Sequence, residues 1–188
     1  MKLTIRHWQE YSFYLTHYLS ENLPAFDYDF DQLPVHYQVQ FFQELTSDRR
    51  QLFYQRVNPF QFSSLFSKLS PPQQLLIVSE LEDHYVMQLF KACRVDDLVN
   101  LFEEVASDDK ERLASLVKEK KLKKIEEFLS YAEHSVGSLM TTEFVSFPSH
   151  LRVDDSLHKI RELASHAESI YYIFTVNEAE QLTGVLSL

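Results

Sequence analysis

Cysteine and glycine are nearly missing from this chain of 188 residues, which contains one cysteine, Cys93, and two glycines, Gly137 and Gly184. A single cysteine excludes an intrachain disulfide and a cysteine-based zinc site. A phosphate-binding loop and a dinucleotide-binding fingerprint both need glycines at close spacing, so both are excluded. Because a chain without disulfides suits a reducing environment, we expect a cytoplasmic location.

Long apolar runs and an excess of basic residues are lacking as well. No stretch of 18 apolar residues occurs, and the first ten residues do not contain the apolar core of a signal peptide. The 18 lysines and arginines are outnumbered by 28 aspartates and glutamates, which gives a net charge of −10. We therefore expect no export, no membrane span within this segment and no nucleic-acid partner, because phosphate contacts need a basic surface.

Catalytic sequence patterns are missing too. The eight histidines never form a His-Glu-x-x-His pair, and no serine lies in a Gly-x-Ser-x-Gly turn. Cys93 follows Val86, Leu89 and Phe90 at helical spacing, which predicts a buried, unreactive thiol on an apolar helix stripe. The sequence therefore predicts a protein that is not an enzyme and has no small-molecule substrate.

What the chain does have is a hydrophobic content of 45%, enough for a sizeable core, and a helical pattern over most of its length. Residues 5–21 carry apolar side chains at helical spacing and predict an opening helix. The acidic stretch Phe26–Asp31 resembles the start of a calcium loop, but Gln32 and Gln38 stand where that loop needs glycine and glutamate. We interpret this stretch as an acidic turn.

From residue 33 onward, helix breakers recur about every twelve residues. Each interval holds one short apolar face, which predicts helices of two to three turns with Ser, Asn or Asp at the N-cap and Pro at the first position. Helices this short must stack to be stable, so residues 1–132 are predicted to form an α-superhelix of short stacked helices. The breakers are Leu33-Pro34, Ser47-Asp48, Asn58-Pro59, Ser70-Pro71, Asp83, Val95-Asp96 and Ser107-Asp108.

The pattern changes near residue 133. We interpret Lys118–Lys124 as the solvated face of the last helix of the first domain, followed by a linker around Ala132 to Gly137. Residues 133–188 then predict a partial α/β unit in the order strand, helix, strand, strand, and the chain stops at Leu188 part-way through this domain. The expected elements are Phe144–Phe147, Asp154–Ala164, Ile170–Val176 and Leu182–Leu188.

Acidic pairs are the one chemical signal that remains. Asp96 and Asp97 are predicted to start one helix, and Asp108 and Asp109 to start the next. Mg²⁺ prefers hard oxygen ligands and keeps several waters, so one or two carboxylates can contribute to a site, and Mn²⁺ is equally compatible in ligand type. N-capping by Asp96 and Asp108 explains the same spacing, and on spacing alone it is the stronger interpretation.

Three stretches of the C-terminal segment stand out: Gly137-Ser-Leu-Met-Thr-Thr-Glu-Phe-Val145, Ile170-Tyr-Tyr-Ile-Phe-Thr-Val176 and Leu182-Thr-Gly-Val-Leu-Ser-Leu188. In this order they resemble the junction and the first CBS repeat of the MgtE family of magnesium transporters. Upstream, Leu69-Ser-Pro-Pro and Val95-Asp-Asp-Leu-Val-Asn-Leu are similar, more loosely, to that family's N-terminal superhelical domain. Together the resemblance covers nearly the whole chain.

This resemblance implies a Mg²⁺-sensing regulatory region at the cytoplasmic face of the cell membrane, attached to a transmembrane pore domain that is absent from this sequence. In such a sensor, the helical domain and a pair of CBS repeats bind Mg²⁺ between them, the sensor compacts and the pore closes. CBS units work in pairs, so a homodimer through them is also implied. The resemblance assigns Mg²⁺ to Asp96, Asp97 and Asn100, the last an amide where the family has a third acid.

Two other functions stay open. A stand-alone helical-repeat scaffold would bind a protein on its concave face and dimerise through its half CBS unit. Adenine-nucleotide binding would need the second half of the CBS repeat. A further CBS repeat and several apolar segments of about twenty residues after Leu188 would favour the transporter.

Overall fold

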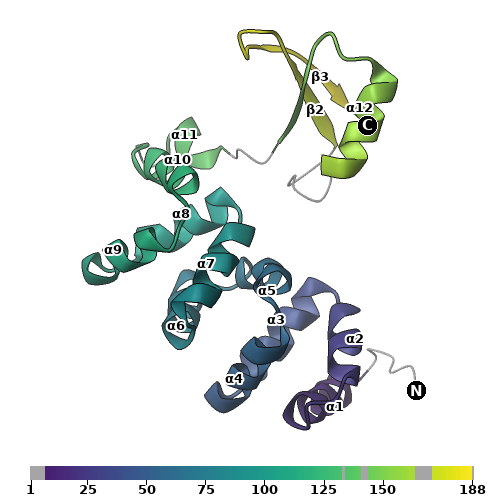
Figure 1. Ribbon diagram of the computed structural model, residues 1–188, viewed down its shortest axis with the longest axis vertical. Coiled ribbons are helices and arrows are strands. Elements are labelled where there is room, and N and C mark those ends of the chain that lie inside the picture. The colour runs from purple at the N-terminus through teal and green to yellow at the C-terminus, as the bar shows by residue number, and fades with distance from the viewer. Residues whose placement is uncertain (1–6, 133, 141–143, 164–170, 188) are drawn as a thin grey trace. The chain divides into compact units, whose positions relative to one another are not determined.

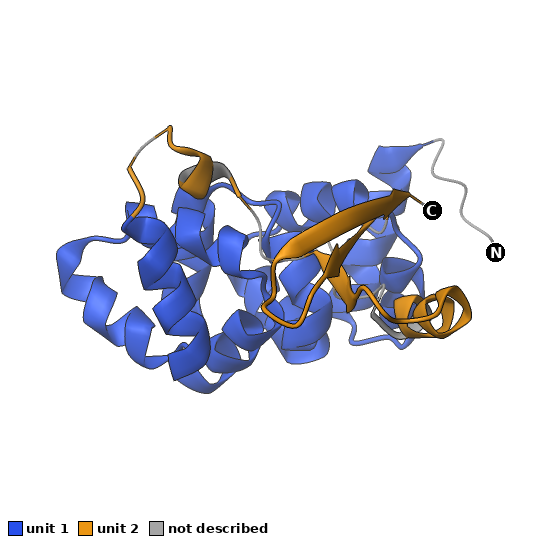
Figure 2. Cartoon of the chain, turned by 90° about the horizontal axis from the view of Figure 1, so that it is seen from above, with its two compact units in different colours: residues 1–130 blue, residues 131–188 orange. Residues whose placement is uncertain are grey.

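The computed structural model describes residues 7–132, 134–140, 144–163 and 171–187. The chain forms two compact units, residues 1–130 and residues 131–188 (Figure 2). Helices build the first unit, and the second contains a small sheet (Figure 1). The predicted fold class, a mainly α chain that ends in a β-α-β-β unit, is confirmed. Residues 141–143 and Ile170, which belong to the motifs quoted above, lie outside the described residues.

Ten helices follow one another through the described part of the first unit and stack as a superhelix of short elements (Figure 1). They are α1 (Trp8–Ser20), α2 (Ala25–Asp31), α3 (Val35–Glu44), α4 (Ser47–Arg56), α5 (Pro59–Phe66), α6 (Pro71–Glu80), α7 (Asp83–Ala92), α8 (Val95–Glu104), α9 (Ser107–Ser115) and α10 (Glu119–Leu129).

A strict period underlies this unit, because helices α3 to α10 begin twelve residues apart, at residues 35, 47, 59, 71, 83, 95, 107 and 119. The same period places one apolar residue in the linker before each of these helices, and every one of these side chains is buried. We call this set the linker ladder; it consists of Leu33, Leu45, Val57, Leu69, Leu81, Cys93, Val105 and Val117.

Each helix from α3 to α8 also buries two consecutive residues in its C-terminal half, such as Phe41 and Phe42 in α3 and Leu101 and Phe102 in α8. Alternate helices pack together: α3 contacts α5, α5 contacts α7, α6 contacts α8, and α8 contacts α10. A helix of about ten residues is marginal by itself, so this packing stabilises the helices more than intrinsic propensity does. Each buried Leu or Phe contributes roughly 1.5–3 kcal/mol relative to an exposed one.

Side chains add hydrogen bonds to backbone carbonyl groups near the C-terminal ends of the short helices, where the regular helical pattern stops. Gln38 of α3 donates a hydrogen bond from Nε2 to the carbonyl oxygen of Phe30 at 3.0 Å. Gln74 occupies the equivalent repeat position in α6 and donates to the carbonyl oxygen of Phe66 at 2.8 Å. The side-chain amide nitrogen at this position therefore bonds to the end of the preceding helix, whereas the buried Oε1 atom of Gln74 has no hydrogen-bond partner among the described residues.

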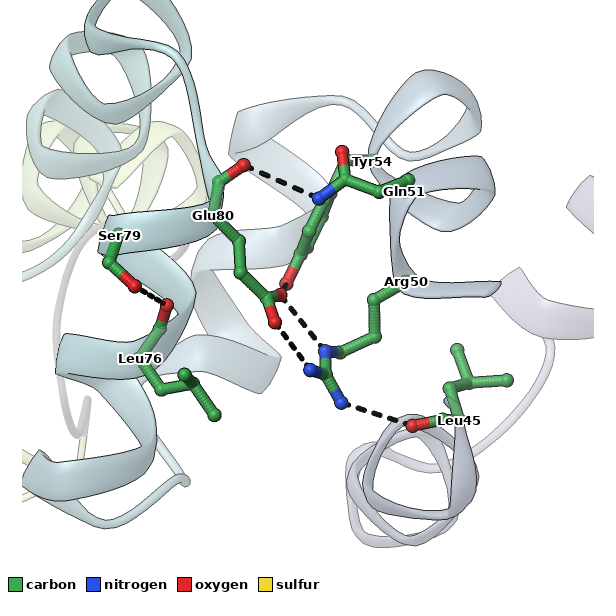
Figure 3. Close-up of polar contacts among 7 residues, drawn as sticks. All are labelled: Leu45, Arg50, Gln51, Tyr54, Leu76, Ser79 and Glu80. Atoms are coloured by element: carbon green, nitrogen blue, oxygen red, sulfur yellow. Dashed lines mark hydrogen bonds and ion pairs between the residues drawn. The ribbon is translucent and has the colours of Figure 1, made fainter. Parts of the chain in front are cut away.

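Helices α4 and α6 are joined by a polar cluster of Arg50, Tyr54 and Glu80 (Figure 3). The guanidinium of Arg50 donates through Nε to Glu80 at 2.9 Å and also to the carbonyl oxygen of Leu45 at 3.1 Å. The Tyr54 hydroxyl donates to the same carboxylate at 2.8 Å. These hydrogen bonds, above all those from Arg50, lower the pKa of Glu80.

The second unit contains a short helix, α11 (Val136–Leu139), and then β1 (Val145–Pro148), α12 (Val153–Leu163), β2 (Tyr172–Val176) and β3 (Leu182–Ser187). Strand β2 lies between the other two, parallel to β1 and antiparallel to β3. Helix α12 contacts β1, and the small core consists of Val145, Phe147, Ile160 and Ile173. The predicted strand-helix-strand-strand order is therefore present, whereas α11 lies where only a linker is predicted.

Three local predictions need correction. Residues 26–31 form helix α2 instead of an acidic turn, because Phe26 and Phe30 lie one turn apart and stack at 5.3 Å in the core. Cys93 is buried as predicted, but it belongs to the linker ladder after α7 and not to a helix stripe. The first strand of the second unit is predicted over Phe144–Phe147, but β1 begins at Val145 and ends at Pro148.

Replacing Glu80 by Ala is expected to lower the free energy of unfolding by about 2–3 kcal/mol at pH 7, because Arg50 and Tyr54 lose their shared acceptor. The pKa of Glu80 is lowered in the folded protein, so its contribution is present above the ordinary value of 4.5 and is lost as the pH falls through the lowered pKa. The free energies of unfolding of wild type and of the Glu80→Ala variant, measured with urea, should thus converge at acid pH. A difference that stays constant from pH 7 to pH 3 would contradict the electrostatic explanation.

Replacing Cys93 by Val is expected to protect the protein against alkaline unfolding. Burial raises the pKa of the thiol to about 12 from an ordinary value of 9.0, so the unfolded chain releases this proton first and stability falls between these two pH values. The free energy of unfolding, measured with urea, should be compared between variant and wild type at pH 8 and at pH 10. From pH 8 to pH 10 this difference should shift in favour of the variant by on the order of 1 kcal/mol. Val57 and Val105 occupy the same ladder position, so the valine should fit. An equal difference at both pH values would refute the buried-thiol explanation.

Candidate metal site on helix α8

The three predicted metal ligands lie on one face of α8. Asp96 and Asp97 are the second and third residues of this helix, and Asn100 follows one turn later. Side chains three and four residues apart are neighbours on a helix, so both carboxylates are near the Asn100 amide. The Asp96 and Asp97 side chains are partly buried, at 26% and 18% exposure, whereas Asn100 is exposed.

A cation within the chain already contacts both carboxylates. Arg94, the residue before α8, bonds to Oδ2 of Asp96 at 2.7 Å and pairs with Oδ2 of Asp97 at 3.3 Å. Arg94 was not singled out by the sequence patterns, although its position two and three residues before the acids was a signal for such pairing. The site is therefore a charge-compensated cluster and not a bare acidic patch.

The second carboxylate oxygen of Asp96 is not bonded to Arg94 in the way that Oδ2 is. Its Oδ1 atom is buried and accepts no hydrogen bond from the described residues. A buried carboxylate oxygen without a donor is costly, and a hard cation is one group that would satisfy it. With Asp97 and the Asn100 carbonyl oxygen nearby, the donor set consists only of oxygens, which fits Mg²⁺.

The set of candidate metal ligands on α8 is nevertheless small. Within the described ranges, no group of three or more His, Cys, Asp or Glu side chains is arranged to hold a metal ion. Two carboxylates and one amide leave coordination positions to water, as is usual for Mg²⁺. Such a site binds weakly by itself, because each retained water takes the place of a protein ligand.

N-capping by Asp96 and Asp108, the alternative explanation of the acids, is wrong. The N-cap residues of α8 and α9 are Arg94 and Ala106, and neither helix has a side-chain cap hydrogen bond. The Asn58 side chain does cap α5, since its Oδ1 accepts from the Gln61 amide at 3.0 Å. In the first turn of a helix the acids still interact favourably with the helix dipole.

Lysine 121 is the second cation of this neighbourhood. From α10, its Nζ donates to the carbonyl oxygens of Phe90 at 2.9 Å and Lys91 at 3.1 Å, at the end of α7, and also to that of Cys93. Besides burial, Asp97 raises the pKa of the Cys93 thiol, and Lys121 lowers it. Asp97 and Lys121 therefore act in opposite directions on the Cys93 thiol, and Arg94 is the basic side chain that pairs with Asp97.

Comparisons with known proteins agree with this architecture. The family described as the MgtE intracellular N domain matches residues 33–134, which is more than half of the chain. The magnesium transporter MgtE of Bacillus subtilis is 28% identical over 157 residues, or 84% of this chain and 35% of that protein. The chain thus spans about a third of the length of this curated relative.

Two solved structures have the same fold. The soluble part of a magnesium transporter matches with a TM-score of 0.88 and 26% identity, over 95% of this chain and 71% of that one. The cytosolic domain of the Mg²⁺ channel MgtE, solved in complex with ATP, matches with a TM-score of 0.80 and 26% identity, over 94% and 73%. Among the described residues, no helix combines the length and apolar character that a membrane crossing requires. The chain belongs to the MgtE family, and residues 33–134 are its intracellular N domain.

Proposed function

We propose that this chain is the Mg²⁺-sensing regulatory region of an MgtE-type magnesium transporter and has no catalytic activity. Membership of the family supports this assignment. The solved relative named as the cytosolic domain of a Mg²⁺ channel supports a location in the cytoplasm, against the membrane. Because the chain spans about a third of its curated relative, the remaining length leaves room for the transmembrane pore domain that we propose as its partner.

The buried, unpaired Oδ1 atom of Asp96 is the observation that carries this proposal. Together with Asp97 and Asn100 it offers the hard oxygen ligands that Mg²⁺ prefers. The ion supplies a divalent positive charge, which draws carboxylates together and screens their repulsion. These three residues are proposed to bind the ion, and Arg94 compensates the charge of the two carboxylates when the ion is scarce.

The response to the ion is proposed to be a population shift. The net charge of −10 favours an open form through self-repulsion, and a bound cation favours a more compact form. The ion changes this equilibrium only to the extent that it binds the compact form more tightly. A weak site is suitable, because a sensor of an abundant ion must release it when its concentration falls.

We further infer that the second unit is the start of a first CBS repeat and takes part in a homodimer. Its sheet has three strands, and β2 and β3 leave large apolar side chains exposed, including Tyr172 at 60% and Leu186 at 52%. Exposed apolar side chains gathered on one small unit are typical of surfaces that another unit covers.

A magnesium titration of the 15N-labelled chain tests the proposal. Addition of Mg²⁺ should shift the NMR signals of the α8 backbone amides and of the Asn100 side-chain amide at millimolar concentrations. Replacing Asp96 by Asn should weaken this binding roughly tenfold, because one charged ligand is lost. Unchanged α8 signals up to tens of millimolar Mg²⁺ would refute the proposed site.

Asp108 provides the matched control for this titration. It occupies the position of Asp96 one repeat later, in the first turn of α9, and is exposed. Replacing Asp108 by Asn removes the same charge and should leave the titration midpoint within about twofold of wild type. Equal weakening by both variants would mean that net charge, and not the α8 face, controls the response.

A further inference from the structure

We propose that Arg94 is a built-in counter-ion that competes with Mg²⁺ for Asp96 and Asp97 and thereby sets the Mg²⁺ concentration at which the α8 face binds the ion. This inference rests on the proposed function, because it concerns the regulation of the same site. It concerns a residue of the chain itself and rests on contacts between side chains of this chain.

The geometry gives Arg94 one carboxylate oxygen from each acid. Its guanidinium bonds to Oδ2 of Asp96 at 2.7 Å and lies 3.3 Å from Oδ2 of Asp97. The Oδ1 atom of Asp96 is left buried and without a hydrogen-bond donor among the described residues. An incoming cation thus reaches the two Oδ2 atoms only if the guanidinium shares them or moves away.

The position of Arg94 in the repeat indicates that pairing, not capping, explains its presence. Arg94 is the N-cap residue of α8, and the equivalent residues before α5 and α6 are Asn58 and Ser70. Asn and Ser are preferred N-caps, whereas Arg has no acceptor atom with which to cap a helix. A cation beside a helix N-terminus is also disfavoured by the helix dipole. The two acids compensate for both disadvantages.

The next repeat shows what the same acids look like without the arginine. Asp108 and Asp109 are the second and third residues of α9, like Asp96 and Asp97 in α8, but the N-cap residue there is Ala106. Both carboxylates of α9 are exposed, and neither has an ion pair with any residue in the described part of the chain. The paired, partly buried arrangement is therefore a property of α8 and does not follow from the repeat itself.

The energetic consequence follows from charge balance. Arg94 is permanently protonated, so its charge opposes a second cation at every physiological pH. Two charges about 5 Å apart interact with about 1 kcal/mol in water and more at a partly buried site. Removing the guanidinium should therefore raise the affinity of the α8 face for Mg²⁺ about three- to tenfold.

The test is a Mg²⁺ titration of the 188-residue chain and its variants, followed by the Asn100 side-chain amide signal and by calorimetry. Arg94→Gln should lower the midpoint about three- to tenfold, because the local negative charge is no longer balanced. Arg94→Lys keeps the charge and should stay within about threefold of wild type. Helical circular dichroism checks folding; if Arg94→Gln loses helix, Arg94→Met, which retains the apolar stem, replaces it.

Lys118 provides the matched control. It is the N-cap residue of α10, two repeats after Arg94, and is exposed. Lys118→Gln removes one positive charge from the equivalent repeat position and should leave the midpoint within about twofold of wild type. A shift equal to that of Arg94→Gln would overturn the inference, because net charge would then account for it.

The outcomes separate this inference from the proposed function. If wild type binds Mg²⁺ at α8 and Arg94→Gln binds it equally or more weakly, Arg94 is not a competing counter-ion, while the sensor proposal stands. If wild type, Arg94→Gln and Arg94→Met all fail to bind Mg²⁺ at α8 up to tens of millimolar, the proposed function and the inference both fail. A lower Mg²⁺ midpoint in Arg94→Gln, without such a shift in Arg94→Lys or Lys118→Gln, supports the proposed function and the inference.

Discussion

Burial of one apolar side chain in each linker is the constraint on which the first unit depends. Its helices have about ten residues, too few for a stable isolated helix, and the chain must reverse direction after each of them. The linker ladder solves both problems, because an extended residue turns the chain while its own side chain enters the core. Where a polar side chain replaces an apolar one inside a helix, as at Gln38 and Gln74, it bonds to the end of the preceding helix.

The same regularity makes the exceptions informative. Among the N-cap residues of the repeat, Asn58 and Ser70 cap their own helices. Arg94 does not cap its helix, and its partners include the two acids that the family resemblance predicts as metal ligands. A position that departs from a repeat without a packing reason is where function is expected. In α8 the departure is a balance of charges, and we propose that a divalent ion changes it.

The helical period, the order of elements in the second unit and the acidic pair of α8 could all be predicted from the sequence, because they depend on local chemistry: turn residues, apolar spacing and adjacent carboxylates. Contacts between distant residues could not. The pairing of Arg50 with Glu80 joins residues thirty apart, and no local pattern predicts it. Helix α2 was missed because alternating acids obscured the two phenylalanines, Phe26 and Phe30, that pack one turn apart.

The position of the candidate site on one helix face could be predicted from the sequence, but its hydrogen bonding could not. Asp96, Asp97 and Asn100 share a helix face because helical geometry alone requires it. The incomplete hydrogen bonding of Asp96 depends on which atoms surround it in three dimensions, so it was not accessible from the sequence. The capping explanation failed for a similar reason, since the start of α8 is set one residue earlier than Asp96, by the ladder residue Cys93 and the turn that follows it.

Packing between alternate helices also limits how far a disturbance can travel. Helix α8 contacts α6 on one side and α10 on the other. A displacement of α8 reaches α10, the last helix of the first unit, in a single step, but it reaches the helices near the N-terminus through several successive interfaces, which begin with those to α6 and α7. Each interface absorbs part of the movement, as in other stacked-repeat proteins. Mechanically, α8 is thus close to the end of the unit from which the chain continues, and α1 is remote from it.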